Sequence, residues 1–141
     1  MNDRFKFRAK RIDNNKFVYG YLCFIYIDNE KHCKIYSPDD AMSYDCYTET
    51  LGQCTGLKDR NGTLIYAGDI VKVPNDWEKY GFLSGMILEV FFNNGGFRLK
   101  PQFNKNSRGS WLEDTEGFEI CGNIHENKDL LKWVKKDLKN F

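Results

Sequence analysis

The feature that most constrains the fold is a regular alternation of short apolar runs with clusters of turn-forming residues. Residues 4–12 alternate strictly between basic and apolar side chains, which predicts a half-buried strand. Residues 16–27 are rich in β-branched and aromatic side chains, which predicts a long strand with Gly20 as a bulge or a point of close approach. With a third short strand expected over 31–36, the N-terminal part should form an antiparallel meander.

The alternation resumes after residues 37–49, which have no clear pattern and are expected to form a loop or a single helical turn. Asn61-Gly62 lies between two apolar stretches and is a good hairpin signal. Short strands are then expected at close spacing over 70–73, 86–92, 97–103 and 118–124. This spacing favours a small barrel or roll that begins near residue 51.

The C-terminal segment has a helical periodicity. Leu130, Val134 and Leu138 recur on one face and form an apolar stripe, so residues 127–141 are expected to be an amphipathic helix. The stripe could pack against the chain's own barrel or against a neighbouring subunit, since terminal elements often mediate symmetric association.

These elements predict a mainly β protein, at the margin of the α+β class. We expect one compact chain in three parts: a β-meander with its linker over 1–50, the barrel or roll over 51–126, and the helix over 127–141. Hydrophobic residues make up 41% of the 141 residues and aromatic residues 16%, which excludes intrinsic disorder. The sequence has neither an apolar run near the roughly 18 residues of a membrane span nor a secretory signal, so we expect a soluble, cytoplasmic protein without a membrane partner.

The sequence lacks the residue patterns of known catalytic and metal sites. His32 and Cys33 would point to opposite faces of a strand, and His125 has no nucleophile turn beside it. The five cysteines are widely and irregularly spaced, which favours reduced core thiols over a disulfide framework or a zinc site. A phosphate-binding glycine loop is also missing. We therefore predict no catalytic residue, no metal and no cofactor.

The formal net charge is +1, yet the charges are segregated along the chain. Residues 4–11 carry five cations and no acid, 39–50 four acids and no cation, 113–126 five acids and no cation, and 128–139 five lysines with two aspartates. Such blocks suit self-association or pairing within the chain better than they suit a dedicated binder of polyanions.

Basic residues interleaved with aromatic residues are the one chemical signal that points to a ligand. A small barrel with exposed rings and cations can stack bases and neutralise phosphates. In the alternative interpretation Phe5 and Phe7 are core residues, and the basic face of this strand, to which Arg8 belongs, pairs with the acidic segments at 39–49 or 113–126. The candidate contacts for nucleic acid or another partner are Arg4, Lys6, Arg8, Lys10, Lys100, Lys105 and Arg108.

Three segments of the chain carry a family resemblance: residues 6–22, residues 52–71 and residues 117–131. Together they resemble the YopX family of phage and prophage proteins, in the same order and over nearly the whole chain. The resemblance implies a β-rich fold with an SH3-type barrel or roll, an oligomeric form and an uncharacterised activity. The signature residues are expected to specify the fold; they are Gly52, Gln53, Thr55, Gly56, Asp59, Gly62, Gly68 and Asp69.

The favoured hypothesis is a non-enzymatic, homo-oligomeric accessory protein of a phage or prophage that binds a host or phage macromolecule in the bacterial cytoplasm. A second hypothesis is a protein that binds single-stranded nucleic acid through the N-terminal cations and residues 97–111. A third is an enzyme, acting on a small molecule or nucleic acid, that would use His32 or His125 beside carboxylates.

Overall fold

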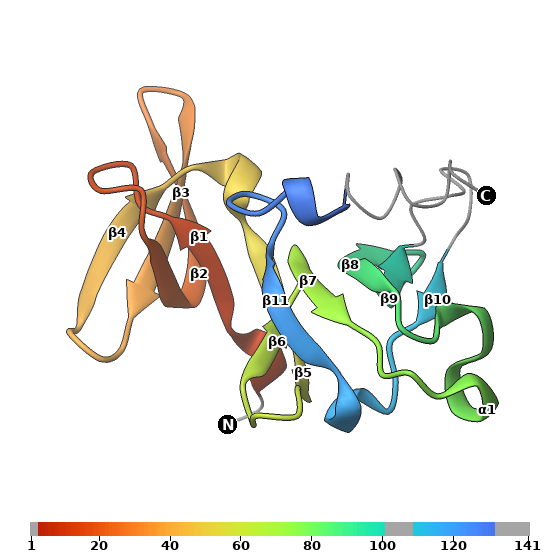
Figure 1. Cartoon of the computed structure of the whole chain (residues 1–141). Coiled ribbons are helices and arrows are strands. Elements are labelled where there is room, and N and C mark those ends of the chain that lie inside the picture. The colour runs from red at the N-terminus through yellow and green to blue at the C-terminus, as the bar shows by residue number, and fades with distance from the viewer. Residues whose placement is uncertain (1–2, 101–108, 132–141) are drawn as a thin grey trace. The chain divides into compact units, whose positions relative to one another are not determined.

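A computed structural model describes residues 3–100 and 109–131 of the chain. The chain divides into two compact units, Met1–Gly56 and Leu57–Phe141 (Figure 1). Antiparallel strands dominate both units, so the predicted mainly β class is confirmed.

The first unit is built on an antiparallel sheet in which β1 to β4 are neighbours in sequence order, while β5 pairs with β1 on its other side. The strand order within this unit is β4-β3-β2-β1-β5. The predicted N-terminal meander is therefore confirmed, with a fourth strand added to the expected three. The elements, with η for a short 3-10 helix, are η1 (Asp3–Phe5), β1 (Phe7–Lys10), β2 (Phe17–Ile27), β3 (Glu30–Ser37), β4 (Met42–Cys46), η2 (Thr48–Thr50) and β5 (Gly52–Lys58).

The fourth strand corrects the expectation for residues 37–49, which we predicted to be a loop or a helical turn. Met42–Cys46 pairs with Cys33–Ser37 as the second strand of a hairpin. The turn itself holds two adjacent acidic residues, Asp39 and Asp40, and Asp40 accepts a hydrogen bond from the Met42 N–H at 3.3 Å. The acidic residues obscured the strand because they lie in its turn and on its exposed side.

The start of the first strand is also corrected. Residues Asp3–Phe5 form η1, and Phe5 is 62% exposed instead of lying on a buried face. Arg8, which the period of two placed on the solvent face, is 5% exposed. Its guanidinium carbon lies 4.6 Å from the centre of the Phe17 ring, so an aromatic side chain from the neighbouring strand covers it.

The core of the first unit is small and is formed by strands β1 to β4. Its buried residues are Ala9, Val18, Cys33, Ile35 and Cys46. Next to this core, β2 and β3 approach each other closely, because a Cβ at Gly20 would lie only 1.9 Å from the carbonyl oxygen of Tyr36. The predicted close approach at Gly20 is confirmed.

The second unit contains a five-stranded antiparallel sheet with the order β10-β9-β8-β7-β11. Its elements are β6 (Leu64–Tyr66), β7 (Asp69–Lys72), α1 (Trp77–Tyr80), η3 (Gly81–Leu83), β8 (Ile87–Asn93), β9 (Gly96–Lys100), β10 (Ser110–Trp111), η4 (Thr115–Gly117) and β11 (Glu119–Asn123). In the described residues this sheet has two edge strands and does not close, so the SH3-type barrel stays a prediction.

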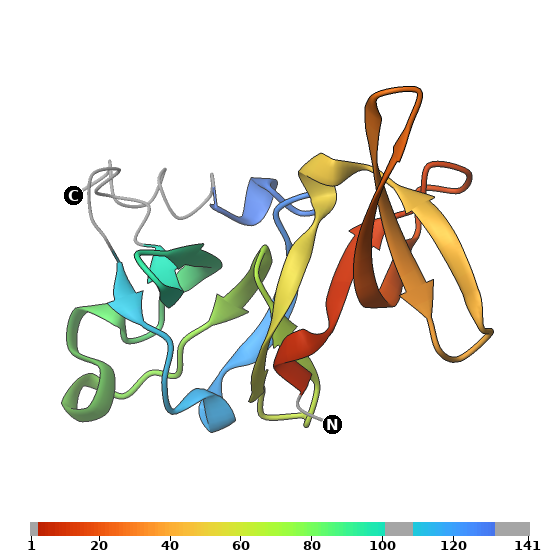
Figure 2. The same cartoon turned by 180° about the vertical axis from the view of Figure 1, so that it is seen from behind.

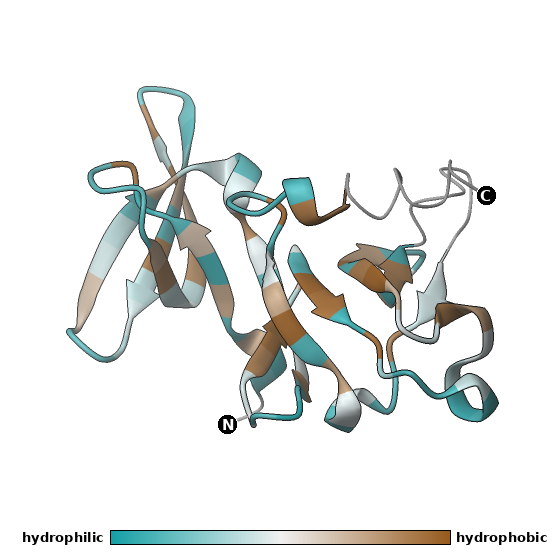
Figure 3. Ribbon diagram, in the orientation of Figure 1, coloured by the Kyte–Doolittle hydropathy of each residue, from teal (hydrophilic) through white to brown (hydrophobic). Residues whose placement is uncertain are grey.

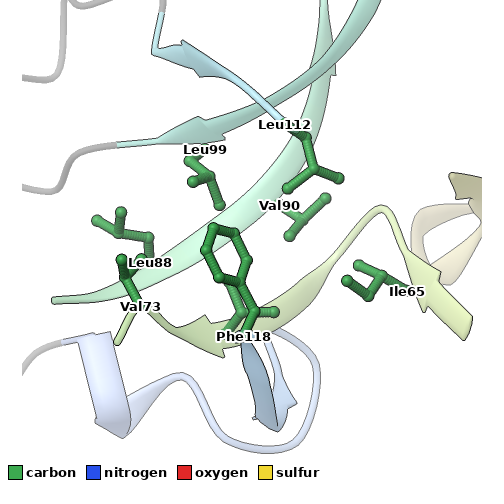
Figure 4. Close-up of a cluster of buried hydrophobic side chains, with 8 residues drawn as sticks. Ile65, Val73, Leu88, Val90, Leu99, Leu112 and Phe118 are labelled. Atoms are coloured by element: carbon green, nitrogen blue, oxygen red, sulfur yellow. The ribbon is translucent and has the colours of Figure 1, made fainter. Parts of the chain in front are cut away.

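The core of the second unit lies on one face of this sheet. Figure 4 shows Phe118 among aliphatic side chains from several strands, and Figure 3 shows the hydrophobic colour along β7 and β8. The buried residues of this core are Ile65, Val71, Val73, Leu88, Val90, Leu99, Leu112 and Phe118.

The described chain ends at the start of the predicted C-terminal helix. Residues 129–131 are helical, with Leu130 half-buried and Leu131 buried. Val134 and Leu138 lie outside the described residues, so the amphipathic helix stays a prediction. In residues 3–100 and 109–131, no helix combines the length and the apolar character needed to cross a membrane.

Candidate interaction surfaces

The signature residues of the central segment make contacts that organise turns. The buried carboxylate of Asp59 accepts hydrogen bonds from the N–H groups of Asn61 at 2.9 Å, Thr63 at 3.0 Å and Ile120 at 3.2 Å. Two of these bonds close the turn between β5 and β6, and the third holds the start of β11. Gly62 completes the turn with a φ of +78°, which glycine adopts without strain.

Other signature residues have the same kind of role. Asp69 is 2% exposed, and its carboxylate accepts a hydrogen bond from the Tyr66 N–H at 2.7 Å across the turn that contains Gly68. In the first unit the Gln53 side chain donates to the carbonyl of Arg4 at 2.8 Å. Each of these contacts positions backbone, and a fold-specifying role for the signature stays a prediction. The remaining members are Gly52, which pairs with Arg8, Thr55, which is buried, and Gly56, which has a positive φ.

The candidate contact cations lie in both units. Lys6 forms an ion pair with Asp3 at 3.3 Å, while Arg8 and Lys10 both lie beside the ring of Phe17, at 4.6 and 5.5 Å from its centre. Arg4, in η1, packs its side chain against Gly56, and Lys100 lies at the end of β9 in the second unit. Lys105 and Arg108 fall outside the described residues.

The titratable groups considered for catalysis lie in strands and turns. His32 is half-buried on β3 opposite Ile25, while the adjacent Cys33 is buried on the other face, as the strand period predicts. His125 lies in the turn after β11, where its N–H donates to the Asn123 side chain at 3.0 Å. In the part of the chain that the structure describes, His, Cys, Asp and Glu side chains do not gather in any group of three suited to a metal ion.

The β2–β3 hairpin extends past the strands that flank it. In the described sheet β1 pairs with β2 from Phe17 to Gly20, and β4 pairs with β3 from Cys33 to Ser37. Residues 24–32 therefore form a two-stranded projection, which we call the hairpin arm. Figures 1 and 2 show its turn directed away from β1 and β4.

The hairpin arm exposes large apolar side chains on both of its faces. Four consecutive residues are exposed: Phe24 by 37%, Ile25 by 38%, Tyr26 by 68% and Ile27 by 49%. Successive side chains of a strand point to opposite faces, so each face of the arm carries two of them. The ammonium group of Lys31 lies 4.0 Å from the centre of the Phe24 ring.

A second surface lies on three neighbouring strands of the second unit. Phe91 of β8 lies opposite Arg98 of β9, which lies opposite Trp111 of β10, and directly opposed side chains share a face of the sheet. Lys100 lies two residues along β9 on the same face, with its ammonium group 5.8 Å from the centre of the Phe91 ring. We call Phe91, Arg98, Lys100 and Trp111 the cation–aromatic surface.

Sequence reasoning identified Lys100 on this surface but not its three neighbours as a group. Arg98 and Trp111 are thirteen positions apart, and their proximity depends on the register between β9 and β10. The available signal was the cluster of aromatic and basic residues over 97–111. This cluster indicated the segment but not which of its side chains lie next to each other.

Comparison with known proteins agrees with the fold described above. The model of the family described as YopX protein matches residues 6–132 of this chain. The crystal structure of protein EF1440 from Enterococcus faecalis is similar, with 25% identity, coverage of 89% of this chain and 96% of that one, and a TM-score of 0.50. The crystal structure of protein yopX from Bacillus subtilis shares 22% identity over 92% of this chain and 98% of its own, with a TM-score of 0.51. No curated protein matches the chain.

Proposed function

We propose that this chain, which belongs to the YopX family, is a non-enzymatic protein that assembles with copies of itself and binds a macromolecule. The resemblance to phage and prophage proteins further supports an accessory role in the cytoplasm of a bacterial host. The observation that carries the proposed self-association is the hairpin arm, with its four consecutive exposed apolar side chains.

An exposed arm of this kind is expected to become more stable when a partner covers its apolar side chains. A two-stranded hairpin on its own is at best marginally stable in water, and contiguous exposed apolar patches mark interaction sites. The side chains of Phe24, Ile25, Tyr26 and Ile27 are on average about half exposed, and full burial of such a side chain contributes roughly 2 kcal/mol. Burying one arm then contributes about 4 kcal/mol, and burying two arms about twice that amount.

A second copy of the chain is the partner that fits the charges of the arm. Asp28, Glu30 and Lys31 lie at its turn, so the arm carries both signs of charge and can be complementary to itself across a two-fold axis. Association costs about 4–15 kcal/mol in lost freedom, which is comparable to the gain from two arms. The assembly is therefore expected to depend on concentration.

Light scattering coupled to size-exclusion chromatography tests the proposal. The wild-type protein should show a mass above that of one chain at tens of micromolar, and dilution should lower it. A double variant, Tyr26→Ser with Ile27→Ser, removes one exposed apolar side chain from each face of the arm and should shift the mass toward the monomer.

A matched control separates this effect from a general loss of surface hydrophobicity. Phe82→Ser removes a side chain that is 79% exposed on η3 in the other unit and should leave the mass unchanged. Circular dichroism should show that all variants fold, because exposed substitutions seldom cost more than about 0.5 kcal/mol. A wild-type protein that is monomeric at every concentration, or equal effects of both substitutions, would refute the proposal.

A further inference from the structure

We propose that the cation–aromatic surface binds a single strand of nucleic acid, with one base stacked on the Trp111 indole and the adjoining phosphates beside Arg98 and Lys100. The inference names the macromolecule that the proposed function left unspecified. It concerns the second unit and does not depend on self-association.

The indole of Trp111 is held against the sheet and is still open to solvent. The side chain is 54% exposed. A Cβ at Gly96 would lie 2.2 Å from Cζ3 of the indole and 3.1 Å from Cε3 and Cη2, so the ring occupies the space that glycine leaves above the backbone. A ring fixed in this way loses little further freedom when a base stacks on it, which favours binding.

Arg98 packs over the same ring. Its guanidinium carbon lies 3.8 Å from the centre of the Trp111 ring, which is a stacking distance. The guanidinium is anchored by two backbone carbonyls, because Nε donates to Asn93 at 3.1 Å and Nη1 donates to Gly109 at 3.3 Å. These two hydrogen bonds orient the guanidinium beside the ring.

The charges around this surface favour a polyanion. Glu89 lies opposite Lys100 on the same face, and its burial raises the pKa of its carboxyl group, while the positive charges of Lys100 and Lys128 act to lower it. Lys100 and Lys128 are therefore the two cations that act on this carboxylate, and Arg98 lies on the same face of β9 as Lys100. The local surface is positive although the whole chain carries a net charge of only +1.

An exposed ring beside cations matches a single strand better than other polyanions. Bases of a single strand are free to stack on aromatic side chains, whereas those of a duplex are already stacked. An acidic peptide would neutralise the cations and leave the ring unused. Since every base has an aromatic face, binding should tolerate different sequences.

Fluorescence anisotropy with labelled oligothymidylate at low salt measures this binding, and oligouridylate serves in a parallel arm to compare DNA with RNA. Trp111→Ala should weaken the affinity on the order of 10- to 100-fold, which is the range for loss of one base–aromatic stack. Trp111→Phe, which keeps an aromatic ring, should have an intermediate affinity. Trp77→Ala is the matched control, because Trp77 is 65% exposed on α1 in the same unit and should not contribute.

The salt dependence tests the electrostatic part separately. The logarithm of the binding constant should fall linearly with the logarithm of the salt concentration, and Lys100→Gln should reduce that slope by about 0.7 if one phosphate contact is lost. Binding of either strand with these variant effects supports the inference. It is overturned by absence of binding at low salt, by equal losses in Trp111→Ala and Trp77→Ala, or by equal competition from duplex DNA or polyglutamate.

The same variants distinguish this inference from the proposed self-association. The Tyr26→Ser, Ile27→Ser variant should bind a short oligonucleotide with wild-type affinity, since the arm lies in the first unit. A monomeric wild-type protein that binds the strand would refute self-association and support this inference. A protein that self-associates but binds neither oligothymidylate nor oligouridylate would support self-association and refute this inference.

Discussion

Replacement of Asp59 by asparagine tests whether the signature segment specifies the fold. The Asp59 carboxylate is 6% exposed and accepts three backbone N–H groups. Its Oδ1 atom accepts from Asn61 and Thr63 within the β5–β6 turn, and its Oδ2 atom accepts from Ile120 in β11, 61 residues along the chain. An asparagine can keep its oxygen toward the turn, but its amide nitrogen then faces the N–H of Ile120.

The expected loss follows from these contacts. A hydrogen bond to a charged group contributes about 1.5–3 kcal/mol, and a buried donor left without an acceptor costs about 1–3 kcal/mol. Asp59→Asn loses one such bond and sets two donors against each other, so it should destabilise the protein by about 2–3 kcal/mol. Asp59→Ala removes all three acceptors and should cost about 4–6 kcal/mol, a large part of the roughly 5–15 kcal/mol that stabilises a typical domain.

Urea unfolding followed by circular dichroism measures the change. With a slope of about 1–3 kcal/mol per molar, a loss of about 2 kcal/mol lowers the midpoint by roughly 1 M. Asp39→Asn is the matched control, since it makes the same chemical change at an exposed turn residue and should stay within about 0.5 kcal/mol of wild type. If Asp59→Asn were as stable as this control, the reasoning that the carboxylate organises the turn and β11 would be refuted.

A substitution at Gly20 and the pH dependence set by Cys46 test the first unit, and Gly62 of the second unit serves as the comparison. Gly20→Ala places a Cβ within 1.9 Å of the Tyr36 carbonyl oxygen and should cost about 3 kcal/mol in urea unfolding; Gly62→Ala, which meets no atom within 4 Å but has a positive φ, should cost only about 1–2 kcal/mol, and a reversed order would contradict the close approach. Burial raises the pKa of the Cys46 thiol from 9.0 to about 11, so its thiol stays neutral in the folded protein where the unfolded chain ionises. Stability should therefore fall as the pH rises from about 9 to about 11, and iodoacetamide at mild alkaline pH should modify exposed Cys23 before Cys46, as mass spectrometry would detect; equal labelling would argue against this burial.

Local signals in the sequence were sufficient to predict most strands and the turns between them. Asn61-Gly62 predicted the β5–β6 hairpin because few residues other than glycine adopt the positive φ that Gly62 has. The alternation of apolar residues also predicted the meander, because one face of each strand must contribute to a core. β4 was missed because its charged residues, Asp40 in the turn and Asp45 beside Lys34, resemble the composition of a loop.

The candidate surfaces could not be predicted in the same way, because they depend on which strands end first and on cross-strand register. The apolar run that ends at Ile27 predicted a strand, but its exposure arises because β1 and β4 stop short of the hairpin turn. The pairing of Arg98 with Trp111 likewise depends on the register between β9 and β10. Arg8 is the reverse case, in which a side chain that the strand period predicted to be exposed is buried, because Phe17 covers it.

The two proposed surfaces together account for how a chain of net charge +1 could bind a polyanion. Two cations and one stacked ring make few contacts with a strand, so a single chain should bind it weakly and the affinity should depend on the ring as much as on charge. Self-association repeats the cation–aromatic surface, and a strand that reaches a second copy binds it at a high effective concentration. Assembly through the hairpin arm would then supply the avidity that a strongly basic protein obtains from its net charge, which is why the exposed apolar arm and the near-neutral composition are consistent with each other.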